Sequence, residues 1–204
     1  MGKTKPRIYL AHPTKMMDYV LPYIEEIEKN CDVEIVNPFV ANEEEACSVE
    51  KIRSGEKNAF ISESAEESRI ITEGDLKIIN ECDGMLAFLP REVKSFGTHM
   101  EVFYFGYILG RRDATFVVSE DFKNHPWVEY CTNEMGRMKT FEEFSNYVKE
   151  NGFPEIGLKN LKGWIPKFYS NVGNQCKKEN LDFDKILPIL EKSMKAAFAF
   201  KDLA

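Results

Sequence analysis

Three polar residues in the middle of the chain have types and positions suited to chemistry. Asp75 lies in an expected helix, Ser95 lies in a loop after an apolar run, and Glu101 lies in the helix that follows. Most neighbours of Glu101 are apolar, Met100 and Val102 among them. Because burying a carboxylate is costly unless another group pairs with it or uses it, Glu101 is a candidate nucleophile or acid–base group.

A structural interpretation of the same residues stands beside the catalytic one. Residues 98–101 match the capping box S/T-x-x-E, in which Thr98 would cap the helix and Glu101 would bond back to it. A carboxylate in the first turn faces the positive end of the helix dipole, which predicts that Glu101 is ionised. Asp75 has a similar alternative as a first-turn helix residue, and Ser95 as an ordinary loop serine.

Short apolar runs alternate with helical patterns along most of the chain. The expected strands are residues 7–11, 33–36, 85–90 and 114–119, and the expected helices are residues 15–29, 73–82, 98–110, 140–151 and 182–203. This alternation predicts an α/β fold with a parallel sheet of about five strands flanked by helices. The acidic segment 41–69 is either a functional lid or a surface excursion.

The expected helix at 182–203 suggests an extension beyond the α/β core. We expect residues 1–120 to form the core, and residues 121–204 to add a remaining core element and a helical C-terminal extension. In parallel sheets, ligands bind beyond the carboxyl ends of the strands. The loop after residues 85–90 and the start of the helix that follows therefore hold the expected site.

Composition excludes several classes of protein. The chain has 204 residues and a formal net charge of −7, which is unfavourable for non-specific nucleic-acid binding. No apolar segment reaches a membrane-spanning length and no signal peptide is evident, so we expect a cytoplasmic protein. The five cysteines and three histidines are scattered, and their spacing predicts neither a disulfide framework nor a metal site.

Three segments carry a resemblance to a known family. They are IYLAHP at 8–13, GDLKIINECDGMLAFLP at 74–90 and SFGTHMEVFYFGYILGRRDATFVV at 95–118. In this order and spacing, they resemble the nucleoside 2-deoxyribosyltransferase family and its relatives, the nucleoside 5′-monophosphate N-glycosidases. The resemblance implies a flavodoxin- or Rossmann-like fold and no metal or organic cofactor.

The resemblance also implies roles for three residues. Glu101 matches the family's catalytic glutamate, which attacks C1′ of the sugar and forms a covalent glycosyl-enzyme intermediate. Asp75 matches an aspartate near the leaving nucleobase, and Tyr9 matches a tyrosine whose hydroxyl holds the glutamate. The family's site is completed by a neighbouring subunit, so a homodimer or higher homo-oligomer is expected.

Substrate-binding candidates lie in the loops around these residues. Ser95, Gly97 and Thr98 precede and open the helix of Glu101, where free N–H groups favour an anion. Ser95 stands where the transferases often carry an aspartate, which favours a substrate with a 5′-phosphate. His12 lies in the first loop, and Asn124 lies in the region expected to reach a neighbouring subunit.

The expected function is cleavage or transfer at the N-glycosidic bond of a (deoxy)nucleoside. Hydrolysis of a nucleoside 5′-monophosphate is the close alternative. A non-catalytic nucleotide-binding module on the same fold is a further one, because a fold does not fix a function. The presence of Tyr9, Asp75 and Glu101 together favours an enzyme.

Overall fold

The computed structural model describes residues 5–42, 50–51, 54, 64–93 and 95–154. The chain divides into two compact units, Met1–Ile156 and Gly157–Ala204, and all the described residues belong to the first. The expected helix at 182–203 and most of the acidic segment 41–69 lie outside the described residues.

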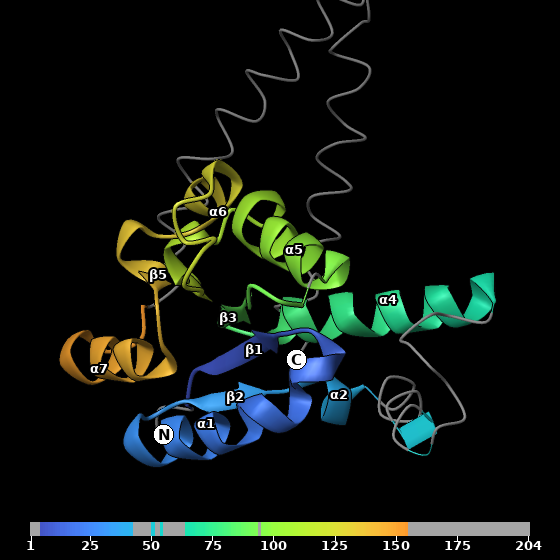
Figure 1. Cartoon of the computed structure of the whole chain (residues 1–204), viewed down its shortest axis with the longest axis horizontal. Coiled ribbons are helices and arrows are strands. Elements are labelled where there is room, and N and C mark those ends of the chain that lie inside the picture. Colours follow the sequence, from blue (N-terminus) through green and yellow to red (C-terminus); the bar gives the residue numbers. More distant parts are fainter. Residues whose placement is uncertain (1–4, 43–49, 52–53, 55–63, 94, 155–204) are drawn as a thin grey trace, which may run out of the picture. The chain divides into compact units, whose positions relative to one another are not determined.

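A parallel sheet of five strands forms the centre of the first unit (Figure 1). The strands are β1 (Arg7–Ala11), β2 (Glu34–Val36), β3 (Gly84–Phe88), β4 (Thr115–Val118) and β5 (Arg137–Met138), in the order β2-β1-β3-β4-β5. All four strand pairs are parallel. The fold class and the strand number predicted from the sequence are therefore confirmed, and β5 completes the sheet beyond residue 120.

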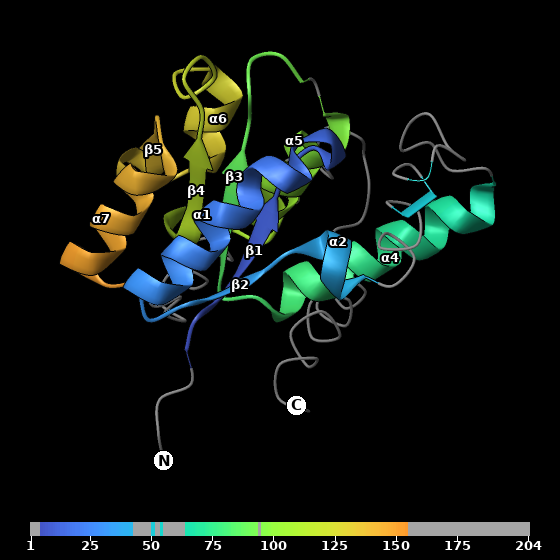
Figure 2. The same ribbon diagram turned by 60° about the horizontal axis from the view of Figure 1, so that its bottom comes forward.

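Helices cover both faces of this sheet (Figure 2). They are η1 (Thr14–Met16), α1 (Met17–Asn30), α2 (Pro38–Ala41), α4 (Ala65–Glu81), α5 (Phe96–Phe103), η2 (Tyr104–Ile108), η3 (Arg112–Ala114), α6 (Pro126–Cys131), η4 (Glu134–Gly136) and α7 (Phe141–Asn151). Helices α1 and α7 pack on one face, and α4, α5 and α6 pack on the other. Within the described residues, no helix is long and apolar enough to cross a membrane.

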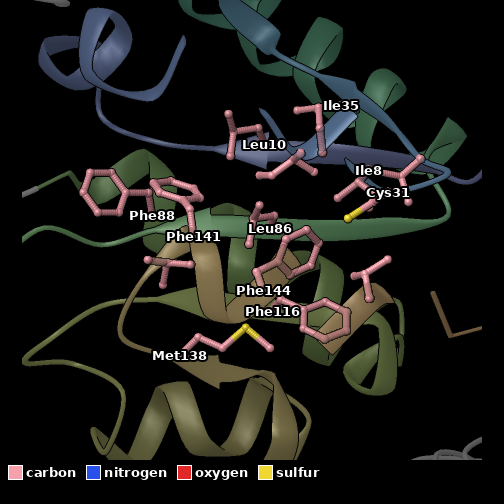
Figure 3. Close-up of a cluster of buried hydrophobic side chains, with 14 of the residues drawn as sticks. Ile8, Leu10, Cys31, Ile35, Leu86, Phe88, Phe116, Met138, Phe141 and Phe144 are labelled. Carbon is pink, nitrogen blue, oxygen red and sulfur yellow. The ribbon is translucent and has the colours of Figure 1, made fainter. Parts of the chain in front are cut away.

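Side chains alternate between the two faces along β1. Ile8 and Leu10 enter the hydrophobic cluster that packs against α1 and α7 (Figure 3). Tyr9 and Ala11 enter the cluster against α4 and α5. This period of two, which every strand obeys, places the Tyr9 side chain in the same layer as the helices that carry Asp75 and Glu101.

Two helices begin earlier than their sequence patterns indicate. Helix α4 begins at Ala65 rather than at residue 73, because the Ser64 hydroxyl accepts a hydrogen bond from the Glu67 N–H and caps it. Helix α5 begins at Phe96 rather than at residue 98. The expected end at Gly110 is confirmed, since this glycine has the positive φ of 65° that is common after a helix.

Candidate active site

The order in which the strands are added to the sheet reverses at β1. The chain passes from β1 to β2 on one side, and then crosses to β3 on the other side of β1. In open parallel sheets, ligands bind at the carboxyl ends of the strands where the order reverses. His12 follows β1 and Ser95 precedes α5, so both lie in loops that leave this edge.

A hydrogen bond between β1 and α5 lies at the centre of the site. The Tyr9 hydroxyl donates to Glu101 Oε1 over 2.7 Å. The Tyr9 side chain is completely buried, and Glu101 is partly buried. Since a buried hydroxyl with a fixed partner has little freedom to rotate, this bond holds the glutamate in one orientation.

The surroundings of Glu101 make its negative charge unfavourable. Burial raises the pKa of this carboxyl to about 7, the hydrogen bond from Tyr9 opposes the increase, and the negative charge of Asp75 adds to it. The expectation that Glu101 lies in the first turn of its helix, where the dipole would favour its charge, is wrong. Helix α5 begins at Phe96, so Glu101 lies in its second turn and not in its first. A carboxyl that titrates near neutral pH is suited to gaining and losing charge during a reaction.

The predicted capping box is also wrong, because Ser95 caps α5. The Ser95 hydroxyl oxygen accepts hydrogen bonds from the N–H of Thr98 over 3.3 Å and from the Thr98 hydroxyl over 2.8 Å. Thr98 is buried beneath this turn. The cap of α5 is therefore Ser95, three residues before the residue that the capping-box pattern indicated. Glu101 is consequently not a capping residue and bonds to Tyr9 instead.

Asp75 lies on α4 and is held by a residue that sequence reasoning missed. The Asn42 side chain donates from Nδ2 to Asp75 Oδ1 over 2.9 Å. Asn42 follows the short helix α2 and is buried. No motif marks Asn42, and a single polar residue after an apolar tetrapeptide gives no signal of a contact with a helix 33 residues away.

A second amide joins the helices that carry Asp75 and Glu101. Asn80 Nδ2 donates to the Tyr104 hydroxyl over 3.2 Å and to the Leu76 carbonyl oxygen over 2.7 Å. Asn80 lies on α4 after Asp75, and Tyr104 lies one turn after Glu101. The hydrogen bond between Asn80 and Tyr104 therefore joins the two helices that carry the acidic residues.

The remaining predicted binding residues have varied surroundings. His12 is buried, with its ring nitrogens 3.0 Å from the Pro13 carbonyl oxygen and 3.3 Å from Asn37 Oδ1, and burial lowers its pKa. Gly97 is exposed at the start of α5, and Asn124 is exposed in the loop before α6. No hydrogen bond joins Asn124 to Tyr9, Asp75 or Glu101 within the described part of the chain, so its expected role toward a neighbouring subunit stays a prediction.

The described part of the chain contains no cluster of three or more His, Cys, Asp and Glu side chains that could hold a metal ion.

Comparison with known proteins gives the family. The family model described as nucleoside 2-deoxyribosyltransferase matches residues 8–183. The chain belongs to this family. The match supports a function of the nucleoside deoxyribosyltransferase type, and it confirms the resemblance carried by residues 8–118.

Solved structures and curated sequences were compared as well. A 2-deoxyribosyltransferase from Bacillus psychrosaccharolyticus is 17% identical, with a TM-score of 0.48, and the match covers 69% of this chain and 91% of that one. No curated protein sequence matches the chain significantly.

The raised pKa of Glu101 predicts how its replacement affects stability. The folded protein binds the Glu101 proton more tightly than the unfolded chain does, so ionisation removes stability as the pH rises from about 4.5 to about 7. We expect Glu101→Gln to stabilise the protein at pH 8 by up to about 3 kcal/mol. The gain should nearly vanish near pH 4.5, where the wild-type carboxyl is protonated in the folded state and half protonated in the unfolded one.

Urea unfolding of the two proteins between pH 4.5 and pH 8 measures this difference. Glu92→Gln is the matched control, because Glu92 is exposed, and its effect should be small at every pH. A Glu101→Gln protein that is equally stable or less stable at pH 8 would show that ionised Glu101 is not destabilising.

Proposed function

We propose that the protein cleaves or transfers at the N-glycosidic bond of a (deoxy)nucleoside, with Glu101 as the nucleophile. The main support is the oriented, desolvated carboxyl of Glu101, bonded to buried Tyr9 and close enough to Asp75 to respond to its charge. The family of the chain acts on nucleosides of this kind.

The proposed reaction has two steps at the same carbon. A Glu101 oxygen forms a bond to C1′ while the C1′–N bond breaks, and its electron pair leaves with the nucleobase, which takes up a proton. A second base or a water molecule then attacks C1′, loses a proton, and releases Glu101. Two displacements at C1′ retain the configuration of the sugar.

Tyr9 and Asp75 assist Glu101 in different ways in this proposal. The hydroxyl of Tyr9 orients the carboxylate and lowers the cost of its charge. Asp75 binds the departing base and passes it the proton, and its own negative charge keeps the proton affinity of Glu101 high.

Loss of the nucleophile tests the proposal directly. Glu101→Gln should abolish base release from a panel of nucleosides and their 5′-monophosphates, offered with and without a second free base, while the protein stays folded. Chromatography of released and exchanged bases is the measurement. A folded Glu101→Gln protein with near-normal turnover excludes the covalent mechanism. Tight nucleotide binding by a wild type without turnover favours a binding module.

The pH dependence tests the ionisation that the nucleophile requires. Since Glu101 must be charged to attack, kcat/KM should fall about tenfold per pH unit below pH 7 and level off above it. Tyr9→Phe keeps the ring and removes the hydroxyl that opposes the raised pKa. Its profile should therefore move to higher pH. An unshifted profile would mean that Tyr9 does not act on the ionising group.

Hydrolysis of a nucleoside 5′-monophosphate is the second candidate function. It is favoured by the neutral cap at the start of α5, where Ser95 stands instead of an aspartate and the first N–H groups of the helix can attract an anion. Gly97 lies in the same turn, and a side-chain carbon placed there would have only Ser95 Oγ nearby, at 4.0 Å. The approach to these N–H groups is therefore sterically open.

Substitutions of Ser95 separate the two substrates. Asp and Asn both cap helices about as well as Ser does, so Ser95→Asp and Ser95→Asn should both fold. The negative charge added by Ser95→Asp should lower kcat/KM for a monophosphate by about tenfold or more, and should leave kcat/KM for the nucleoside nearly unchanged. Ser95→Asn adds no charge and should affect both values of kcat/KM similarly. Equal effects of Ser95→Asp on both substrates would exclude a phosphate contact and favour transfer.

We also propose that the protein is a homodimer or a higher homo-oligomer. A surface on α5, η2 and α6 exposes large apolar side chains: Phe96, Met100, Tyr107, Ile108, Trp127 and Tyr130. The rings connect, since Tyr107 lies 5.4 Å from Tyr130 and Phe103 lies 5.9 Å from Trp127 between ring centroids. Contiguous apolar patches of this kind commonly mark protein contacts, and this one includes the helix of Glu101.

Light scattering at micromolar concentration tests the assembly. We expect a mass of at least two chains, and we expect Trp127→Glu to lower it, because a charge at the centre of an apolar interface is unfavourable. Val40→Glu, on a side chain of α2 that is equally exposed, should leave the mass unchanged. A fully active wild-type monomer would contradict the proposal.

A further inference from the structure

Asn42 bonds to two acceptors on one face of α4. Its Nδ2 atom donates to Asp75 Oδ1 over 2.9 Å and to the Ile71 carbonyl oxygen over 3.2 Å. Ile71 and Asp75 are four residues apart, so their acceptors follow one another along the helix face. An amide nitrogen has two hydrogens, and each has a partner here. The two bonds together fix the plane of the amide.

The chain around Asn42 holds it firmly in this place. Asn37 caps α2 by accepting from the Phe39 N–H over 3.1 Å, and Pro38 opens the helix. The Asn42 N–H donates to the Pro38 carbonyl oxygen over 2.8 Å. Asn42 itself is only 7% exposed. The short helix α2 thus presents one buried amide to α4.

Gly74 supplies a second and independent observation. A side-chain carbon at this position would lie 2.7 Å from Asn42 Nδ2 and 3.1 Å from its Cγ, so the Asn42 amide would have to shift to admit it. Glycine within a helix costs about 1 kcal/mol relative to alanine. The absence of a side chain at residue 74 is therefore what admits the amide to the helix face beside Asp75.

We propose that Asn42 is a positioning residue for Asp75, and that Gly74 provides the space in which it acts. The inference deepens the proposed function and rests on it, since it concerns how the departing nucleobase receives its proton. Asn42 does not touch the reacting atoms. It acts by holding the carboxyl group that handles the base.

The direction of the hydrogen bond determines which oxygen of Asp75 can carry a proton. Nδ2 can only donate, so Oδ1 must accept. A proton held by Asp75 therefore sits on Oδ2, and this oxygen delivers it to the departing base nitrogen as the C1′–N bond breaks. Without Asn42, Oδ1 would lose its hydrogen-bond donor and could carry the proton as well.

A comparison of leaving groups separates this role from a structural one. A nucleobase needs a proton to leave, whereas 4-nitrophenolate leaves as a stable anion without one. We expect Asn42→Ala to lower kcat for the best nucleoside of the panel at least about tenfold. The 4-nitrophenyl glycoside of the same sugar should react at nearly the wild-type rate. Asp75→Asn should give the same pattern.

Two further variants complete the experiment. The double variant Asn42→Ala with Asp75→Asn should be no slower than Asp75→Asn alone, because the residues act as one unit. Gly74→Ala displaces the amide without deleting it, and should lower kcat for the nucleoside but not for the 4-nitrophenyl glycoside. This variant tests the inference even if Asn42→Ala does not fold.

Asn80→Ala is the matched control. It removes the partly buried amide of Asn80 on α4, and should slow the reaction of both substrates to the same degree.

The possible results distinguish this inference from the function that it rests on. Turnover by Glu101→Gln overturns the proposed function itself. A different combination of results overturns the positioning role alone. In it, Glu101→Gln is inactive and Asp75→Asn slows the nucleoside but not the 4-nitrophenyl glycoside, whereas Asn42→Ala and Gly74→Ala do not distinguish the two substrates. Equal losses on both substrates in Asn42→Ala, or losses that multiply with those of Asp75→Asn, also overturn it.

Discussion

The hydrogen bond between Tyr9 and Glu101 is the contact on which the arrangement of the site depends. It joins Tyr9 on β1 to a glutamate 92 residues later on α5, and places a carboxyl group where water is largely excluded. Such a group opposes folding when it is charged. The fold tolerates it because the surrounding strands and helices bury a large apolar core on both faces of the sheet.

The two acidic residues reach each other through backbone elements that come from different parts of the chain. Asp75 lies on the helix before β3, and Glu101 lies on the helix after it. The pair Asn80–Tyr104 joins these helices on one side, and Asn42 anchors Asp75 on the other. A pair of like charges needs this kind of support, because repulsion would otherwise turn the flexible side chains apart.

The extent to which the sequence predicts this structure varies with the range of the interaction. The strands could be predicted because parallel strands are buried on both faces and appear as continuous apolar runs. The alternation of side chains along a strand also predicts that Tyr9 lies on the opposite face of the sheet from Ile8 and Leu10. The start of α5 could not be predicted, since Ser95 and Thr98 both make good caps and the sequence does not select between them. Asn42 was missed because its partners on α4 belong to a distant segment.

The proton affinity of Glu101 has a consequence for the energetics of ligand binding. At neutral pH a population of molecules carries the proton and another lacks it. A ligand that displaces water from this carboxyl, or brings a charge near it, changes the balance between the two. Binding then exchanges protons with the solvent. The heat observed in calorimetry consequently depends on the ionisation enthalpy of the buffer, and its slope across buffers counts the protons that the site takes up or releases.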